Sequence, residues 1–129
     1  MYYFSTRLQG DIDDVEKKVT EALKEEGFGV LTEIDIQKTL KAKLDVDYPP
    51  YRILGACNPP FANQALQAEP EVGLLLPCNV VVRQDGDGSI VVSFMDPAAV
   101  LTLVEKPQVK ELAGQVRERL LRVKAALEG

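Results

Sequence analysis

The spacing of hydrophobic and polar positions predicts two long amphipathic helices, one near each end of the chain. In the first helix, apolar residues recur every three or four positions between Asp11, a suitable N-cap, and Gly27, a suitable left-handed stop. The second helix begins at Pro107, because a proline in the first turn forfeits no helical hydrogen bond. Its predicted inward face comprises Val109, Leu112, Ala113, Val116, Leu120 and Val123. Each helix therefore offers one apolar face to a core.

Five other stretches are predicted to be extended, because β-branched and aromatic residues are frequent in them. They are residues 2–9, 29–33, 51–57, 76–84 and 89–95. The last two flank Asp85-Gly86-Asp87-Gly88, where glycines supply the positive φ angles that a tight hairpin turn requires. These two strands are therefore expected to pair antiparallel.

Two short helices are predicted between the strands. Ile36, Leu40 and Leu44 lie four positions apart on the first, and the prolines of residues 48–50 end it. Residues 59–68 form the second, opened by two prolines. The predicted order is β-α-β-(short α)-β-(short α)-β-β-α, an α+β fold in which two long helices pack on one face of an antiparallel sheet. No repeat or linker divides residues 1–129, so we expect one domain.

The predicted hairpin carries apolar residues on both of its faces. Val80-Val81-Val82 and Ile90-Val91-Val92 are consecutive, unlike the alternation expected of a strand with one face in water. The long helices cover one face, and a second copy of the same sheet is the simplest cover for the other. The alternative is that the short middle helices fold across it. The pattern favours a homodimer.

Composition and charge narrow the class of protein. Of the 129 residues, 46% are hydrophobic, enough to bury a core without a metal or disulfide. The net charge of -5 repels a phosphate backbone, so we expect no nucleic-acid partner. Neither a signal peptide nor a membrane span is indicated, which predicts a cytoplasmic protein with reduced thiols.

The chain contains no histidine, and this excludes several kinds of site. A Ser-His-Asp triad, a Cys-His pair and a histidine-ligated zinc or haem are all impossible. Catalysis would have to use a carboxylate, a lysine, a tyrosine or a cysteine, so whether the protein is an enzyme stays open. We expect no cofactor.

Both cysteines precede an asparagine, in Cys57-Asn58-Pro59 and Pro77-Cys78-Asn79. If the strand ends meet, these four side chains form one polar site for a neutral or singly charged small molecule, since no Lys or Arg occurs between Arg52 and Arg83. The ordinary interpretation is that the thiols are small buried groups and the amides cap local turns. The candidate ligand-binding residues are Cys57, Asn58, Cys78, Asn79 and the strand-end carboxylate Glu33.

Cys57 is the better candidate for a reactive thiol. It precedes the helix opened by Pro59, whose macrodipole would lower a thiol pKa. The two cysteines are too far apart in sequence for the close Cys-X-X-Cys spacing of redox pairs and local zinc sites. A metal would need Glu33, Asp35 or a partner subunit's thiols as further ligands, so no metal is expected.

A resemblance rests on several segments of the chain. They are Tyr51-Arg52-Ile53-Leu54-Gly55-Ala56-Cys57-Asn58-Pro59, Ala65-Leu66, Gly73-Leu74-Leu75-Leu76-Pro77-Cys78-Asn79-Val80-Val81-Val82, Asp96-Pro97 and Glu33-Ile34-Asp35. Together they resemble the DUF302 family. The resemblance implies an α+β domain, with one helix after the first strand and another after the last, around a curved antiparallel sheet similar to that of the TATA-binding protein. It also implies a dimer, but no biochemical role.

The sequence thus predicts a small-molecule-binding domain whose site is built from the Cys-Asn motifs of a homodimer. One alternative is a histidine-free thiol enzyme or redox protein that uses Cys57. The second alternative is a structural dimerisation module with no site.

Overall fold

Five strands form one antiparallel sheet in the computed structural model, which describes residues 1–129. The strands are β1 (Tyr3–Leu8), β2 (Gly29–Asp35), β3 (Tyr51–Cys57), β4 (Cys78–Gln84) and β5 (Ile90–Met95). Their order across the sheet is β1-β5-β4-β3-β2, and each neighbouring pair runs antiparallel. The predicted α+β class is confirmed. β4 begins two residues later than expected, after Pro77, which has no N–H to give to a strand ladder.

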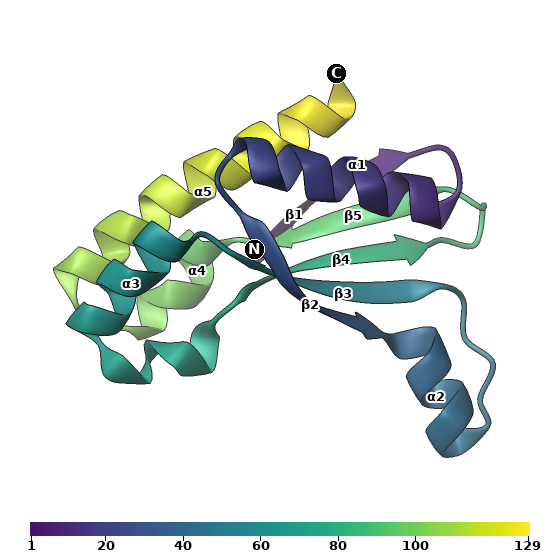
Figure 1. Ribbon diagram of the computed structural model, residues 1–129, viewed down its shortest axis with the longest axis horizontal. Coiled ribbons are helices and arrows are strands. Elements are labelled where there is room, and N and C mark those ends of the chain that lie inside the picture. Colours follow the sequence, from purple (N-terminus) through teal and green to yellow (C-terminus); the bar gives the residue numbers. More distant parts are fainter.

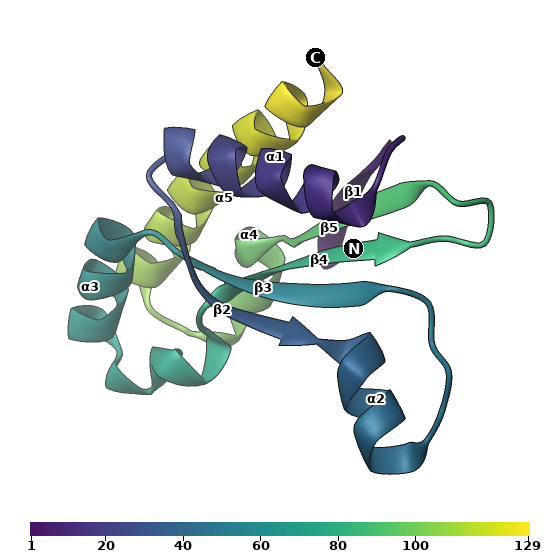
Figure 2. The same ribbon diagram turned by 45° about the vertical axis from the view of Figure 1, so that its right-hand side comes forward.

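Two long helices lie on one face of the sheet, and the shorter helices lie at its two ends. The long helices α1 (Ile12–Glu25) and α5 (Pro107–Glu128) cover one face (Figure 1). At one end lies α2 (Ile36–Leu44), and Figures 1 and 2 show α3 at the opposite end, beside α5. The group at that end comprises α3 (Pro59–Ala68), α4 (Pro97–Val100) and the 3₁₀ helices η1 (Pro70–Leu75) and η2 (Leu101–Leu103). The predicted order of elements is confirmed.

Local signals account for where these elements begin and end. The Asp11 carboxylate accepts a hydrogen bond from the Asp13 N–H, as an N-cap does, and Gly27 follows α1 with a φ of 86°. The β4–β5 turn ends at Gly88, whose φ is 85°. The two strands are joined across it by a hydrogen bond from the Asp85 N–H to the Ser89 carbonyl. These sequence signals act within a few residues, so the boundaries follow them closely.

The consecutive valines serve two different faces of the sheet. Val80 and Val82 point to the helix-covered face, where both are fully buried. Val81 pairs with Ser93 on the other face and is only half-buried. We call this second face, which carries Tyr3, Tyr51, Ile53, Val81 and Met95, the open face. Neither α2 nor α3 lies across it, since they stand at opposite ends of the sheet (Figures 1 and 2).

Two separate clusters of buried side chains form the core. The larger holds 16 residues between the sheet, α1 and the C-terminal half of α5. The smaller holds 7 residues between α3, η1, η2 and the N-terminal half of α5. All six predicted inward residues of α5 are buried, but Val109 belongs to the smaller cluster and Val123 to the larger. Phe61 of α3 packs against both clusters, at the seam between them.

Candidate functional site

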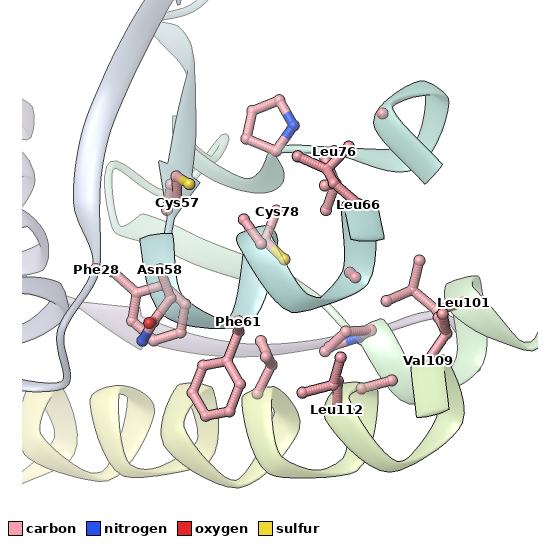
Figure 3. Close-up of a pocket in the computed structure, with 18 of the residues that line it drawn as sticks. Phe28, Cys57, Asn58, Phe61, Leu66, Leu76, Cys78, Leu101, Val109 and Leu112 are labelled. Carbon is pink, nitrogen blue, oxygen red and sulfur yellow. The ribbon is translucent and has the colours of Figure 1, made fainter. Parts of the chain in front are cut away.

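A cavity of about 300 Å³ opens at this seam. Side chains from both clusters line it, at the end of β3, the start of β4, and along α3 and α5 (Figure 3). Of its 19 lining residues, 15 are hydrophobic, and none is Asp, Glu, Lys or Arg. The cavity is therefore an apolar space without any fixed charge in its wall.

Small side chains explain why this space is not filled. Ala56 of β3, Ala62 and Ala65 of α3, Gly73 of η1 and Ala113 of α5 all line the cavity. Elsewhere the core is filled by branched side chains such as those of the valines and leucines of the sheet and long helices. Protein interiors normally pack to the density of organic crystals, so a wall of small residues between two well-packed clusters leaves room for another molecule.

The structure brings together three of the five predicted site residues. Cys57, Asn58 and Cys78 line the cavity. Asn79 pairs with Gly55 and is exposed on the open face, because neighbouring strand residues point in opposite directions. Glu33 also lies away from the cavity, in β2 beside Glu16 of α1. The second Cys-Asn motif is thus divided between the two faces of the sheet.

The thiols differ in their exposure. Cys57 is half-buried and Cys78 is buried, and both are free. Burial raises the pKa of the Cys78 thiol to about 11, with a smaller contribution from negative charge on Cys57. Cys57 ends β3, and Asn58 separates it from α3. Pro59 and Pro60 occupy the first turn of α3 and have no N–H, so this helix presents fewer free amides than most N-termini do.

Asn58 holds two distant elements together instead of capping its own helix. Its buried side chain donates from Nδ2 to the Glu26 carbonyl at 3.2 Å and makes no cap hydrogen bond, so the expectation of local capping is wrong for this residue. Arg119 Nη1 donates to the same carbonyl at 3.0 Å. The Arg119 guanidinium also lies 5.2 Å from the Phe61 ring centroid, a cation–π distance. These contacts position Phe61 in the cavity wall.

Glu33 belongs to a separate charged cluster on the helix-covered face. Arg52 Nη1 lies 2.8 Å from an Asp13 carboxylate oxygen and 3.2 Å from one of Glu16. Burial, followed by the hydrogen bond with Glu33, raises the pKa of the Glu16 carboxyl to about 7. No group of three or more Cys, Asp and Glu side chains is arranged to hold a metal ion. The cluster is therefore a partly buried group of one arginine and three carboxylates.

Several lining residues could not be identified from the sequence. Phe28, Phe61, Leu76 and Leu112 follow the same apolar spacing as ordinary core residues. The one local signal is the repeated alanines of α3, because their side chains fill less space than the leucines and valines of a typical inward helix face. Only the packing of distant segments shows which apolar residues face the cavity.

A comparison with family models decides the relationship of this chain. The model described as "Domain of unknown function DUF302" matches residues 4–127. The chain belongs to the DUF302 family. The predicted resemblance is thereby confirmed, and so is the arrangement it implies, with one helix after the first strand and another after the last.

A solved structure of this family has the same fold. The crystal structure of an uncharacterized conserved DUF302 protein from Bacillus stearothermophilus is 29% identical in sequence, with a TM-score of 0.90 over 98% of both chains. No protein with a curated description matches the chain. None of the helices is long and apolar enough to cross a membrane. The family description names no activity or ligand, so function has to be argued from the cavity itself.

Proposed function

We propose that this protein binds a neutral, apolar small molecule in the cavity between α3, α5 and the ends of β3 and β4. The observation that carries the proposal is a lined space of about 300 Å³ without a charged side chain in its wall. This volume lies at the lower end of the range of about 300–1,000 Å³ for small-molecule pockets. An ionised ligand would lose its hydration there without gaining a partner. We therefore expect a neutral ligand, whereas the sequence also allowed a singly charged one.

The position of the cavity supports a binding role. It lies where the two buried clusters meet, and Phe61 is the residue that packs against both. Ligand sites are frequent at such boundaries, because separately packed units can move apart slightly without disrupting either core. Cys57, Asn58 and Cys78 then form the least apolar part of the wall.

A fluorescence titration tests this function. N-phenyl-1-naphthylamine, an uncharged apolar dye, should bind the wild-type protein saturably with one site per chain. Ala113→Leu fills the cavity from α5 and should weaken binding at least tenfold, while overpacking costs about 1–3 kcal/mol of stability. Ala42→Leu makes the same change at an exposed position of α2 and should bind as the wild type does.

Two results would overturn the proposal. One is a wild-type protein that neither brightens the dye nor gains thermal stability from it, since a ligand at one hundred times its Kd should add about 2.7 kcal/mol. The other is equal binding by Ala113→Leu while its circular dichroism remains native. Either result would favour the interpretation of this protein as a structural module without a site.

We also propose a homodimer formed through the open face. Tyr2, Tyr3, Tyr51 and Met95 line a shallow hollow there, and Tyr3 is 39% exposed. The charges at one end of this face are internally paired, since Asp85 lies 2.8 Å from Arg7 and 3.4 Å from Arg83. A face without a large unpaired charge does not repel an identical copy.

The dimer is tested by sedimentation at micromolar concentration. We expect a dimeric mass for the wild type and a monomeric mass for Val81→Lys, because Val81 lies on the open face. Val46→Lys places the same charge at a position that is already 43% exposed, away from the sheet, and should leave the mass unchanged. A monomeric wild type would remove this proposal without affecting the cavity.

The reducing cytoplasm remains the expected location, and both free cysteines are compatible with it.

The thiol enzyme remains the alternative, and one observation favours it. Cys57 is half-buried and lines the cavity, so a bound molecule would lie within reach of its sulfur. Cys78 is unsuited to the role, because its pKa of about 11 leaves it protonated near neutral pH. The rates of thiol alkylation described in the Discussion distinguish a reactive Cys57 from an inert one.

A further inference from the structure

Leu31 occupies an irregular position in β2. Val30 pairs with Ala56 and Thr32 pairs with Gly55, so Leu31 is an extra residue without a partner in β3. This is a β-bulge, and bulges redirect a side chain away from the regular alternation of a strand. Leu31 is 67% exposed and yet lines the cavity. Its side chain therefore lies where the cavity meets solvent.

Leu66 has the same combination of properties on a different element. It belongs to α3, is 42% exposed and lines the cavity (Figure 3). A single exposed leucine needs no explanation. Two exposed leucines that line one uncharged apolar cavity are both able to contact a hydrocarbon that extends from the interior to the surface.

We propose that Leu31 and Leu66 flank the entrance of the cavity, and that the ligand is an unbranched aliphatic chain with an uncharged polar end left in solvent. This inference rests on the proposed binding function. The cavity is small, so a longer chain has to continue past the rim, and the two leucines cover the part that emerges. No charged lining residue attracts a carboxylate or phosphate end, and the net charge of -5 repels such an end even where it stays in water.

The proposal is tested with straight-chain 1-alkanols from hexanol to dodecanol, which displace N-phenyl-1-naphthylamine. Each methylene that becomes buried should increase affinity about fourfold. In Leu31→Ala and Leu66→Ala we expect the short alcohols to bind as in the wild type, whereas the gain from the last methylenes of the longer alcohols is lost. 1-Decanol should bind more tightly than borneol, a compact alcohol of equal carbon number, and more tightly than decanoate.

Leu44→Ala is the matched control. Leu44 is also 67% exposed, but it lies in α2 and does not line the cavity. Leu44→Ala should therefore keep the wild-type dependence of affinity on the chain length of the alcohol. If both rim variants keep that dependence too, or if borneol or decanoate binds as tightly as 1-decanol, the inference is wrong while the proposed function survives. If the wild type binds neither dye nor alkanol, the proposed function itself is wrong.

Discussion

The buried thiol of Cys78 should make the stability of this protein fall at alkaline pH. Burial raises its pKa from 9.0 to about 11 in the folded protein. Between these values the unfolded chain has released the proton and the folded chain still holds it, so deprotonation favours unfolding. The contribution is fully present below pH 9 and is lost as the pH rises through about 11. Two pKa units correspond to about 2.7 kcal/mol.

The measurement is urea unfolding of reduced protein at a series of pH values from neutral to alkaline. Other groups titrate in the same range, so the quantity of interest is the difference between wild type and Cys78→Ala. This difference should change by about 2–3 kcal/mol over the alkaline range, because the variant has lost only the buried thiol. Cys57→Ala removes the half-buried cysteine and should keep most of the wild-type slope, since burial is the main cause of the shift. Equal slopes for wild type and Cys78→Ala would refute the reasoning.

Three further predictions concern single residues. Cys57 should react with iodoacetamide faster than the other cysteine because it is less buried, and equal inertness of both would remove the thiol-enzyme alternative. Gly55→Ala should lower the free energy of unfolding by about 1–3 kcal/mol, because the new Cβ would lie 2.8 Å from Pro77 Cγ. The control is Gly114→Ala, whose new Cβ lies in open space on α5. It should raise the free energy of unfolding slightly in the same urea titration. The raised pKa of Glu16 contributes stability that is present below pH 4.5 and lost as the pH rises through about 7, so Glu16→Gln should flatten this dependence in thermal melts, and an unchanged profile would contradict it.

The sequence alone determined the five strands, the helices α1, α2, α3 and α5, and their order, but the predicted order did not include the short helices η1, α4 and η2. The bounds of β3 and α3 agree with the prediction from sequence, and the Asp85–Gly88 turn lies where it was expected. The physical reason is that hydrophobic periodicity, caps, prolines and glycines act over a few neighbouring residues. Family resemblance extended this local information to the arrangement of two helices on one sheet.

Only the tertiary structure decided which of these residues share a site. Cys57 and Cys78 line one cavity, but Asn79 points to the open face and Glu33 lies beside Glu16, although all four were predicted to belong to one ligand-binding site. The cavity itself exists because small side chains from β3, α3, η1 and α5 meet between two packed clusters. The bulge that turns Leu31 toward its rim depends on the register with β3. Such features arise from packing and pairing between distant segments, which no local pattern records.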